Sequence, residues 1–124
     1  MVITNYHSPF TNHELIMTTS LSHTRKLRVA VLFGGRSGEH DVSLMSARSV
    51  LAVLDPEKYE VTQVGITLDG EWLHGANTLE AFNSGKFNVL NRVILPGDPS
   101  HSKIYELRST DQGEAINKLA DIDV

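Results

Sequence analysis

The stretch from Leu27 to Asp55 constrains the fold more than any other part of the chain. It opens with an apolar, β-branched-rich run, residues 27–33, which is typical of a strand buried on both faces. Glycines interrupt the chain in residues 34–38, and from Leu44 apolar side chains recur at a three-and-four spacing until Pro56. The sequence therefore predicts a strand, a glycine loop and an amphipathic helix, which together open a βαβ unit.

The predicted loop carries carboxylates as well as glycines. Backbone N–H groups at a helix N-terminus attract anions, yet Glu39 and Asp41 already place negative charge there. We expect Asp41 to cap the helix through its side chain. Glu39 would then be a fixed charge at the carboxyl end of a strand, where open α/β sheets bind ligands. This arrangement favours a cationic group, such as a substrate ammonium, over a phosphate.

Two phosphate-binding motifs do not fit this loop. A dinucleotide fingerprint ending at Gly35 and Gly38 would need its first glycine at Phe33. A P-loop would need glycine at Glu39 and lysine at His40. A glycine-rich turn is equally typical of a purely structural turn, so the glycine pattern alone leaves a binding loop and a structural turn open.

The segment FGGRSGEHDVSL, residues 33–44, is followed by Ser46-Ala47 and closely resembles the N-terminal signature of D-alanine–D-alanine ligases. Those are ATP-grasp enzymes of peptidoglycan biosynthesis. Residues 65–72 resemble the second strand and hairpin of that family, and residues 95–99 are similar to an insertion in one branch of it. The resemblance covers about residues 26–124.

The resemblance implies roles for particular residues of the loop. Glu39 matches the glutamate that receives the ammonium of the first D-alanine, although a helix-terminal charge without a ligand is the alternative interpretation. Val42 matches the valine that packs near the methyl group of that substrate. Five further members of the signature are expected to support the loop and the helix start: Gly34, Gly35, Ser37, His40 and Ser43. No catalytic residue and no metal ligand is expected in this chain.

The expected fold is an α/β, Rossmann-like, three-layer N-terminal (pre-ATP-grasp) domain with a mostly parallel sheet. Residues 26–124 are expected to form this domain, truncated and incomplete at the C-terminus, and residues 1–25 a disordered N-terminal extension. Asp69-Gly70 predicts a hairpin turn. The remaining elements follow from local patterns: strands at 59–66, 92–95 and 103–107, helices at 77–84 and 112–120, and the start of a buried strand at 121–124.

Composition narrows the class of protein. The chain has 124 residues, enough for one domain, with 40% apolar residues and a formal net charge of −4. Mild acidity gives no support for nucleic-acid binding, and no stretch approaches the length of a membrane span. The absence of cysteine excludes disulfides and fits a cytoplasmic protein. His7, His13 and His23 lie in the extension, and their spacing matches no standard metal site.

The implied activity is the ATP-dependent joining of two D-alanines, in which an acyl phosphate of the first is attacked by the amine of the second. The chain itself is expected to bind D-alanine but no cofactor, because ATP and Mg belong to the ATP-grasp domains, its missing partners in the same enzyme. It should be inactive alone, and the complete enzyme is expected to be a homodimer. A D-alanine–D-lactate ligase fragment and a stand-alone, non-catalytic Rossmann-like binding module remain as alternatives.

Overall fold

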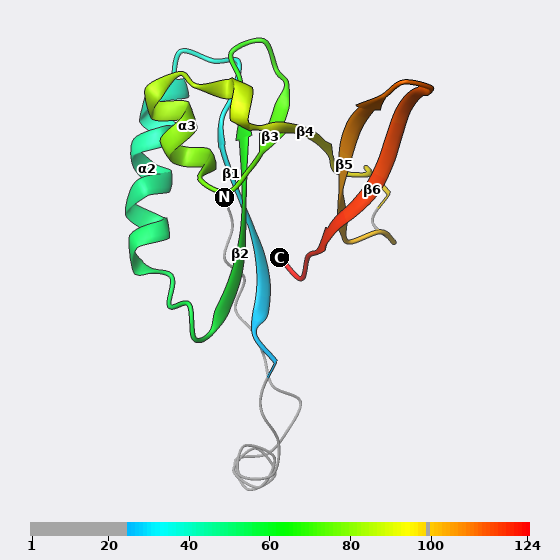
Figure 1. Cartoon of the computed structure of the whole chain (residues 1–124). Coiled ribbons are helices and arrows are strands. Elements are labelled where there is room, and N and C mark those ends of the chain that lie inside the picture. The colour runs from blue at the N-terminus through cyan, green and yellow to red at the C-terminus, as the bar shows by residue number, and fades with distance from the viewer. Residues whose placement is uncertain (1–24, 99) are drawn as a thin grey trace, which may run out of the picture.

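The computed structural model describes residues 25–98 and 100–124, and it contains one six-stranded sheet with helices packed on one face (Figure 1). The predicted extension, residues 1–25, lies outside the described residues except for Arg25, and its three histidines lie wholly outside them. The elements in chain order are β1 (Leu27–Gly34), α2 (His40–Val53), β2 (Tyr59–Ile66), β3 (Trp72–His74), α3 (Thr78–Ser84), the 3-10 turn η1 (Phe87–Val89), β4 (Asn91–Ile94), β5 (Lys103–Thr110) and β6 (Gly113–Asp121).

The opening strand, glycine loop and helix form as the sequence predicted. β1 runs parallel to β2, with Leu27 opposite Tyr59 and Gly34 opposite Ile66, and α2 makes the crossover between them. The expected cap at Asp41 is wrong. The helix starts two residues earlier than this cap implies, with Glu39 in the capping position and no side-chain cap, so Asp41 lies in the first turn. A carboxylate there still interacts favourably with the helix dipole.

The predicted mostly parallel sheet is wrong. Strand order is β1-β2-β3-β4-β5-β6, and only β1 and β2 are parallel; the other four neighbouring pairs are antiparallel. A parallel pair needs a long crossover connection, whereas an antiparallel pair can be joined by a tight turn. Short turns at Asp69-Gly70 and at residues 111–112 therefore bring the chain back on itself.

The predicted helix at residues 112–120 is also wrong, because this segment is β6. It pairs with β5 along eight residue pairs, from Lys103 opposite Asp121 to Thr110 opposite Gly113. Gly113 has φ 125°, which closes the hairpin. A register shift near Ile104 displaces the ladder by one residue. Ile116, which belongs to the apolar spacing that resembled a helix face, is 58% exposed, so this spacing did not mark a buried face.

Two apolar clusters lie on opposite faces of β1 and β2. The first joins the odd-numbered β1 side chains to α2 and α3, and it comprises Val29, Val31, Phe33, Leu44, Ala47, Leu73 and Phe82. The second holds Ala30, Val64, Val93, Ile104 and Ile122, so the β5–β6 ribbon covers the face opposite the helices (Figure 1). Because successive side chains of a strand point to opposite faces, β1 contributes to both clusters. The predicted three-layer fold is therefore wrong for the described residues, since no helix covers the second face.

The last residues lie along the outer edge of β1. Val124 donates its backbone N–H to the Arg28 carbonyl at 3.2 Å and accepts from the Ala30 N–H at 2.8 Å. The predicted strand at 121–124 is thus confirmed only in part, because Asp121 ends β6 and residues 122–124 are hydrogen-bonded to β1 without forming a regular strand. The predicted helix at 77–84 is confirmed as α3, which Gly85 ends in the left-handed conformation.

Candidate functional site

The glycine loop is folded tightly against the end of β2. Gly34 and Gly35 have φ values of 89° and 112°, a region that other residues rarely adopt. The Gly35 N–H donates to the Ile66 carbonyl at 2.8 Å, and a β-carbon on Gly34 would overlap the same oxygen. Both conformation and space therefore require glycine at position 34.

Three side chains from the predicted support set contact the backbone of this loop. The Ser43 hydroxyl accepts from the Gly34 N–H at 3.0 Å, and the Ser37 hydroxyl accepts from the Glu39 N–H at 3.2 Å. His40 Nδ1 lies 2.8 Å from the Gly35 carbonyl oxygen. Because a carbonyl can only accept, the hydrogen bond requires a proton on Nδ1. The first turn of α2 thus holds the loop that precedes it.

Glu39 and Val42 line one hollow at the start of α2. Its volume is about 270 Å³, and it is completed by Leu32, Ser43, Ser46 and Ala47. Glu39 is exposed, and 54% of Val42 is accessible. The hollow therefore offers a carboxylate, small hydroxyls and an apolar wall, which suit a small amino acid with a short apolar side chain. The substrate roles of Glu39 and Val42 stay predictions.

The sequence did not single out the wall formed by Leu32, Ser46 and Ala47. Ser46-Ala47 belonged to the recognised signature, and its spacing from Val42 by about one helical turn could have indicated the shared face. Leu32 could not have been found in this way, because it reaches the hollow from the strand, on the face opposite the first apolar cluster.

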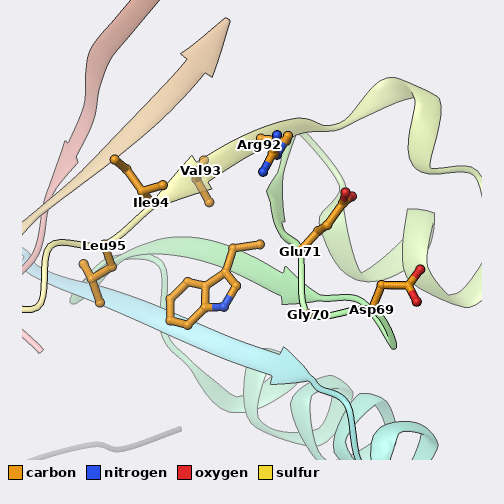
Figure 2. A pocket seen from close by; sticks show the side chains of 8 residues that line it. Asp69, Gly70, Glu71, Arg92, Val93, Ile94 and Leu95 are labelled. Carbon is orange, nitrogen blue, oxygen red and sulfur yellow. The ribbon is translucent and has the colours of Figure 1, made fainter. Parts of the chain in front are cut away.

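A second hollow, of about 330 Å³, lies between the β2–β3 turn and β4 (Figure 2). It is lined by Asp69, Gly70, Glu71, Trp72, Arg92, Val93, Ile94 and Leu95. Figure 2 shows the acidic side chains toward the turn and Leu95 toward the opposite end. None of the predicted substrate residues lies here. Trp72 is half-buried and packs against the second apolar cluster, so its ring covers the sheet.

In the part of the chain that the structure describes, no three histidine or acidic side chains come together as a metal site. No helix of that part is long and apolar enough to cross a membrane.

Comparison with known proteins decides the family. The model of the family described as "D-ala D-ala ligase N-terminus" matches residues 28–124. This chain belongs to that family. The expected membership is therefore confirmed, and the matched model describes the N-terminal domain of a ligase.

Named relatives agree with this assignment. The D-alanine–D-alanine ligase of Natranaerobius thermophilus is 46% identical over 102 residues, which cover 81% of this chain and 26% of the relative. That of Rhodococcus opacus is 43% identical over 105 residues, covering 80% and 28%. The chain thus spans about a quarter of the length of the curated ligases that it matches.

Solved structures show the same mixed α/β fold. The VanG D-Ala:D-Ser ligase from Enterococcus faecalis has a TM-score of 0.58 and 30% identity, over 66% of this chain and 25% of that one. The D-alanine–D-alanine ligase from Helicobacter pylori has a TM-score of 0.53 over 77% and 28%, and at 22% identity it supports the fold alone. The fold of this family member is therefore that of a ligase N-terminal domain.

Proposed function

We propose that this chain is the N-terminal substrate-binding portion of a cytoplasmic, ATP-dependent D-alanine–D-alanine ligase of peptidoglycan biosynthesis. The observation that carries the proposal is the shared hollow of Glu39 and Val42, within the family match over residues 28–124. Curated relatives with the D-alanine–D-alanine name do not favour a D-alanine–D-lactate ligase or a stand-alone binding module.

In this proposal the chain binds and orients the first D-alanine. The Glu39 carboxylate pairs with the substrate ammonium, and the apolar wall of Leu32, Val42 and Ala47 accommodates the methyl group. The substrate carboxylate then faces away from Glu39, since like charges repel, and points toward the remainder of the enzyme. One small, charge-matched hollow thereby orients the reacting group.

The other parts of the ligase would supply the phosphoryl-transfer chemistry. ATP with Mg activates a carboxylate by phosphorylation, and such transfer depends on cations placed around the phosphates. The second hollow offers a single arginine beside two carboxylates. Because the carboxylates repel phosphate groups, this is a poor environment for a nucleoside triphosphate. The 124-residue chain should therefore hydrolyse no ATP alone, and in the complete enzyme it would work within a homodimer.

Glu39→Gln tests the proposed site, because it keeps the side-chain size and removes the charge. The variant is made in a chimera that joins this chain to the remaining domains of the Natranaerobius thermophilus ligase. Losing a hydrogen bond between charged groups costs about 1.5–3 kcal/mol, which is about ten- to a hundredfold in affinity. We expect the KM of the first D-alanine to rise by that factor, with the KM of ATP nearly unchanged.

Glu114→Gln is the matched control, because Glu114 is exposed on β6. It should leave both KM values unchanged. Normal D-alanine affinity in the Glu39→Gln chimera would reduce Glu39 to a structural residue of the helix start and refute the site assignment.

A further inference from the structure

The conformation of the glycine loop has to be held in place by other groups. Two consecutive residues, Gly34 and Gly35, have positive φ values, and glycine loses more conformational freedom on folding than any other residue. The Gly35 N–H is held by the Ile66 carbonyl of β2. The carbonyl of the same Gly35 is held from the opposite direction, by His40 of α2. Gly35 is thus fixed between the end of β2 and the start of α2.

The His40 ring is itself fixed by packing. It lies nearly parallel to the Phe82 ring of α3, with 6.2 Å between centroids and 25° between planes. Phe82 is buried and contacts Phe33 edge-on at 5.6 Å and Phe87 at 5.0 Å. A β-carbon on Gly34 would lie 3.0 Å from His40 Cε1, so the ring also covers the loop glycine. The imidazole therefore has one well-defined position between α3 and the loop.

We propose that His40 is a positioning residue of the D-alanine site, and that its Nδ1–H donates to the Gly35 carbonyl, which locks the loop and presents Glu39. This inference rests on the proposed function. Glu39 precedes His40 directly, and its own N–H is held by Ser37 of the same loop. Release of the Gly35 carbonyl would free the loop between β1 and α2 and thereby move the carboxylate away from the substrate ammonium.

A second histidine of the chain makes a similar contact and can be compared with His40. His74 of β3 also places Nδ1 against a backbone carbonyl, that of Gln63, at 2.7 Å. This second contact secures the β2–β3 pair, and neither residue lines the Glu39 hollow. Removing either histidine deletes a similar hydrogen bond, but only His40 is connected to the loop.

The first test measures the tautomer in the 124-residue chain. Long-range ¹⁵N–¹H correlation spectra distinguish the Nδ1–H form from the Nε2–H form, which predominates in free neutral imidazole. At about pH 8, above the ordinary histidine pKa, we expect His40 to show the Nδ1–H form, assigned by loss of its signals in His40→Asn. An Nε2–H or averaged ring would overturn the proposal, whatever the activity of the ligase.

The second test measures kinetics in the chimera described above. Asparagine carries an N–H donor at the position of Nδ1, whereas leucine carries none. Loss of one hydrogen bond costs about 0.5–1.5 kcal/mol, so His40→Leu should raise the KM of the first D-alanine about two- to tenfold. ATP KM should be unchanged, and His40→Asn should restore most of the D-alanine affinity.

His74→Leu is the control, and it should lower the melting temperature without changing the D-alanine KM. Equal D-alanine KM values for the Leu and Asn variants of His40, or the same KM increase in His74→Leu, would refute a positioning role. If instead Glu39→Gln has no effect, the proposed function fails, while the tautomer measurement still decides whether His40 locks the loop.

Discussion

At the scale of single residues, the loop glycines are not equivalent. Gly34 combines φ 89° with a β-carbon position that overlaps the Ile66 carbonyl oxygen, a backbone atom that cannot move aside easily. Gly38 lies in the same loop, and its β-carbon would have nothing within 4 Å. The fold therefore requires glycine at position 34, whereas position 38 can accept a side chain.

We expect Gly34→Ala to destabilise the chain strongly and Gly38→Ala to leave it nearly unchanged. Backbone strain of this kind costs about 1–3 kcal/mol, and the overlap with Ile66 adds to it. At Gly38 the substitution removes only unfolded-state freedom, an effect of about 0.4–1 kcal/mol in favour of folding. Urea unfolding of both variants measures the difference. Equal midpoints would mean that the loop relaxes without cost.

At the scale of elements, a carboxylate fastens the residues that follow β6 to the start of β1. Asp123 accepts from the Arg28 backbone N–H at 2.8 Å, from the Arg28 guanidinium at 2.9 and 3.1 Å and from Arg25 at 2.8 Å. These hydrogen bonds, those from Arg28 foremost, hold the pKa of the Asp123 carboxyl far below its usual range. Arg25 is mostly exposed, and we expect it to contribute little.

Asp123→Asn should lower the free energy of unfolding at neutral pH, and the loss should shrink in acid. A carboxyl whose pKa is lowered by folding stabilises the native state above its unfolded pKa, about 3.9, and the stabilisation disappears as pH falls toward the folded value. Urea midpoints at about pH 7 and about pH 3 measure this change. Asp111→Asn, in the exposed β5–β6 turn, is the control. A pH-independent difference would show that the charge is not what holds Arg28.

At the scale of the whole molecule, the outer edge of β1 is covered at its start and at its end and, in the described part of the chain, is open at Leu32. The Val124 backbone is hydrogen-bonded to the Arg28 carbonyl and the Ala30 N–H, and the Ser43 hydroxyl accepts from the Gly34 N–H. Because strand residues alternate, the backbone N–H and C=O of Leu32 point to the same edge as those of Arg28 and Ala30. Among the described residues, these groups have no hydrogen-bond partner along that edge. The edge borders the Glu39 hollow, which Leu32 also lines.

An open strand edge beside an apolar hollow is a template for further pairing. We therefore expect the 124-residue chain to associate or to be poorly soluble as concentration rises. Size-exclusion chromatography with light scattering, followed by a thermal melt, tests this expectation. A monodisperse monomer that melts cooperatively well above ~65 °C, beyond the usual range for mesophilic domains, would contradict it.

The sequence by itself determined the strand, glycine loop and helix, the family, and the placement of Glu39 at the end of β1. These features depend on local chemistry: apolar periodicity, glycines and a specific signature lie within residues 27–55. The turn at Asp69-Gly70 and the helix ended by Gly85 were predictable for the same reason, since each depends on neighbouring residues.

Only the tertiary structure decided which strands pair and which contacts hold the loop. Residues 112–120 have a helix-like apolar spacing, but from Gly113 onward they pair with β5, with one irregularity at Leu119. The antiparallel order of the sheet likewise depends on pairing between distant residues. Local sequence also could not show that Phe82, 42 positions after His40, would stack on that ring. Such contacts depend on how the complete chain packs, and no short window of sequence encodes that arrangement.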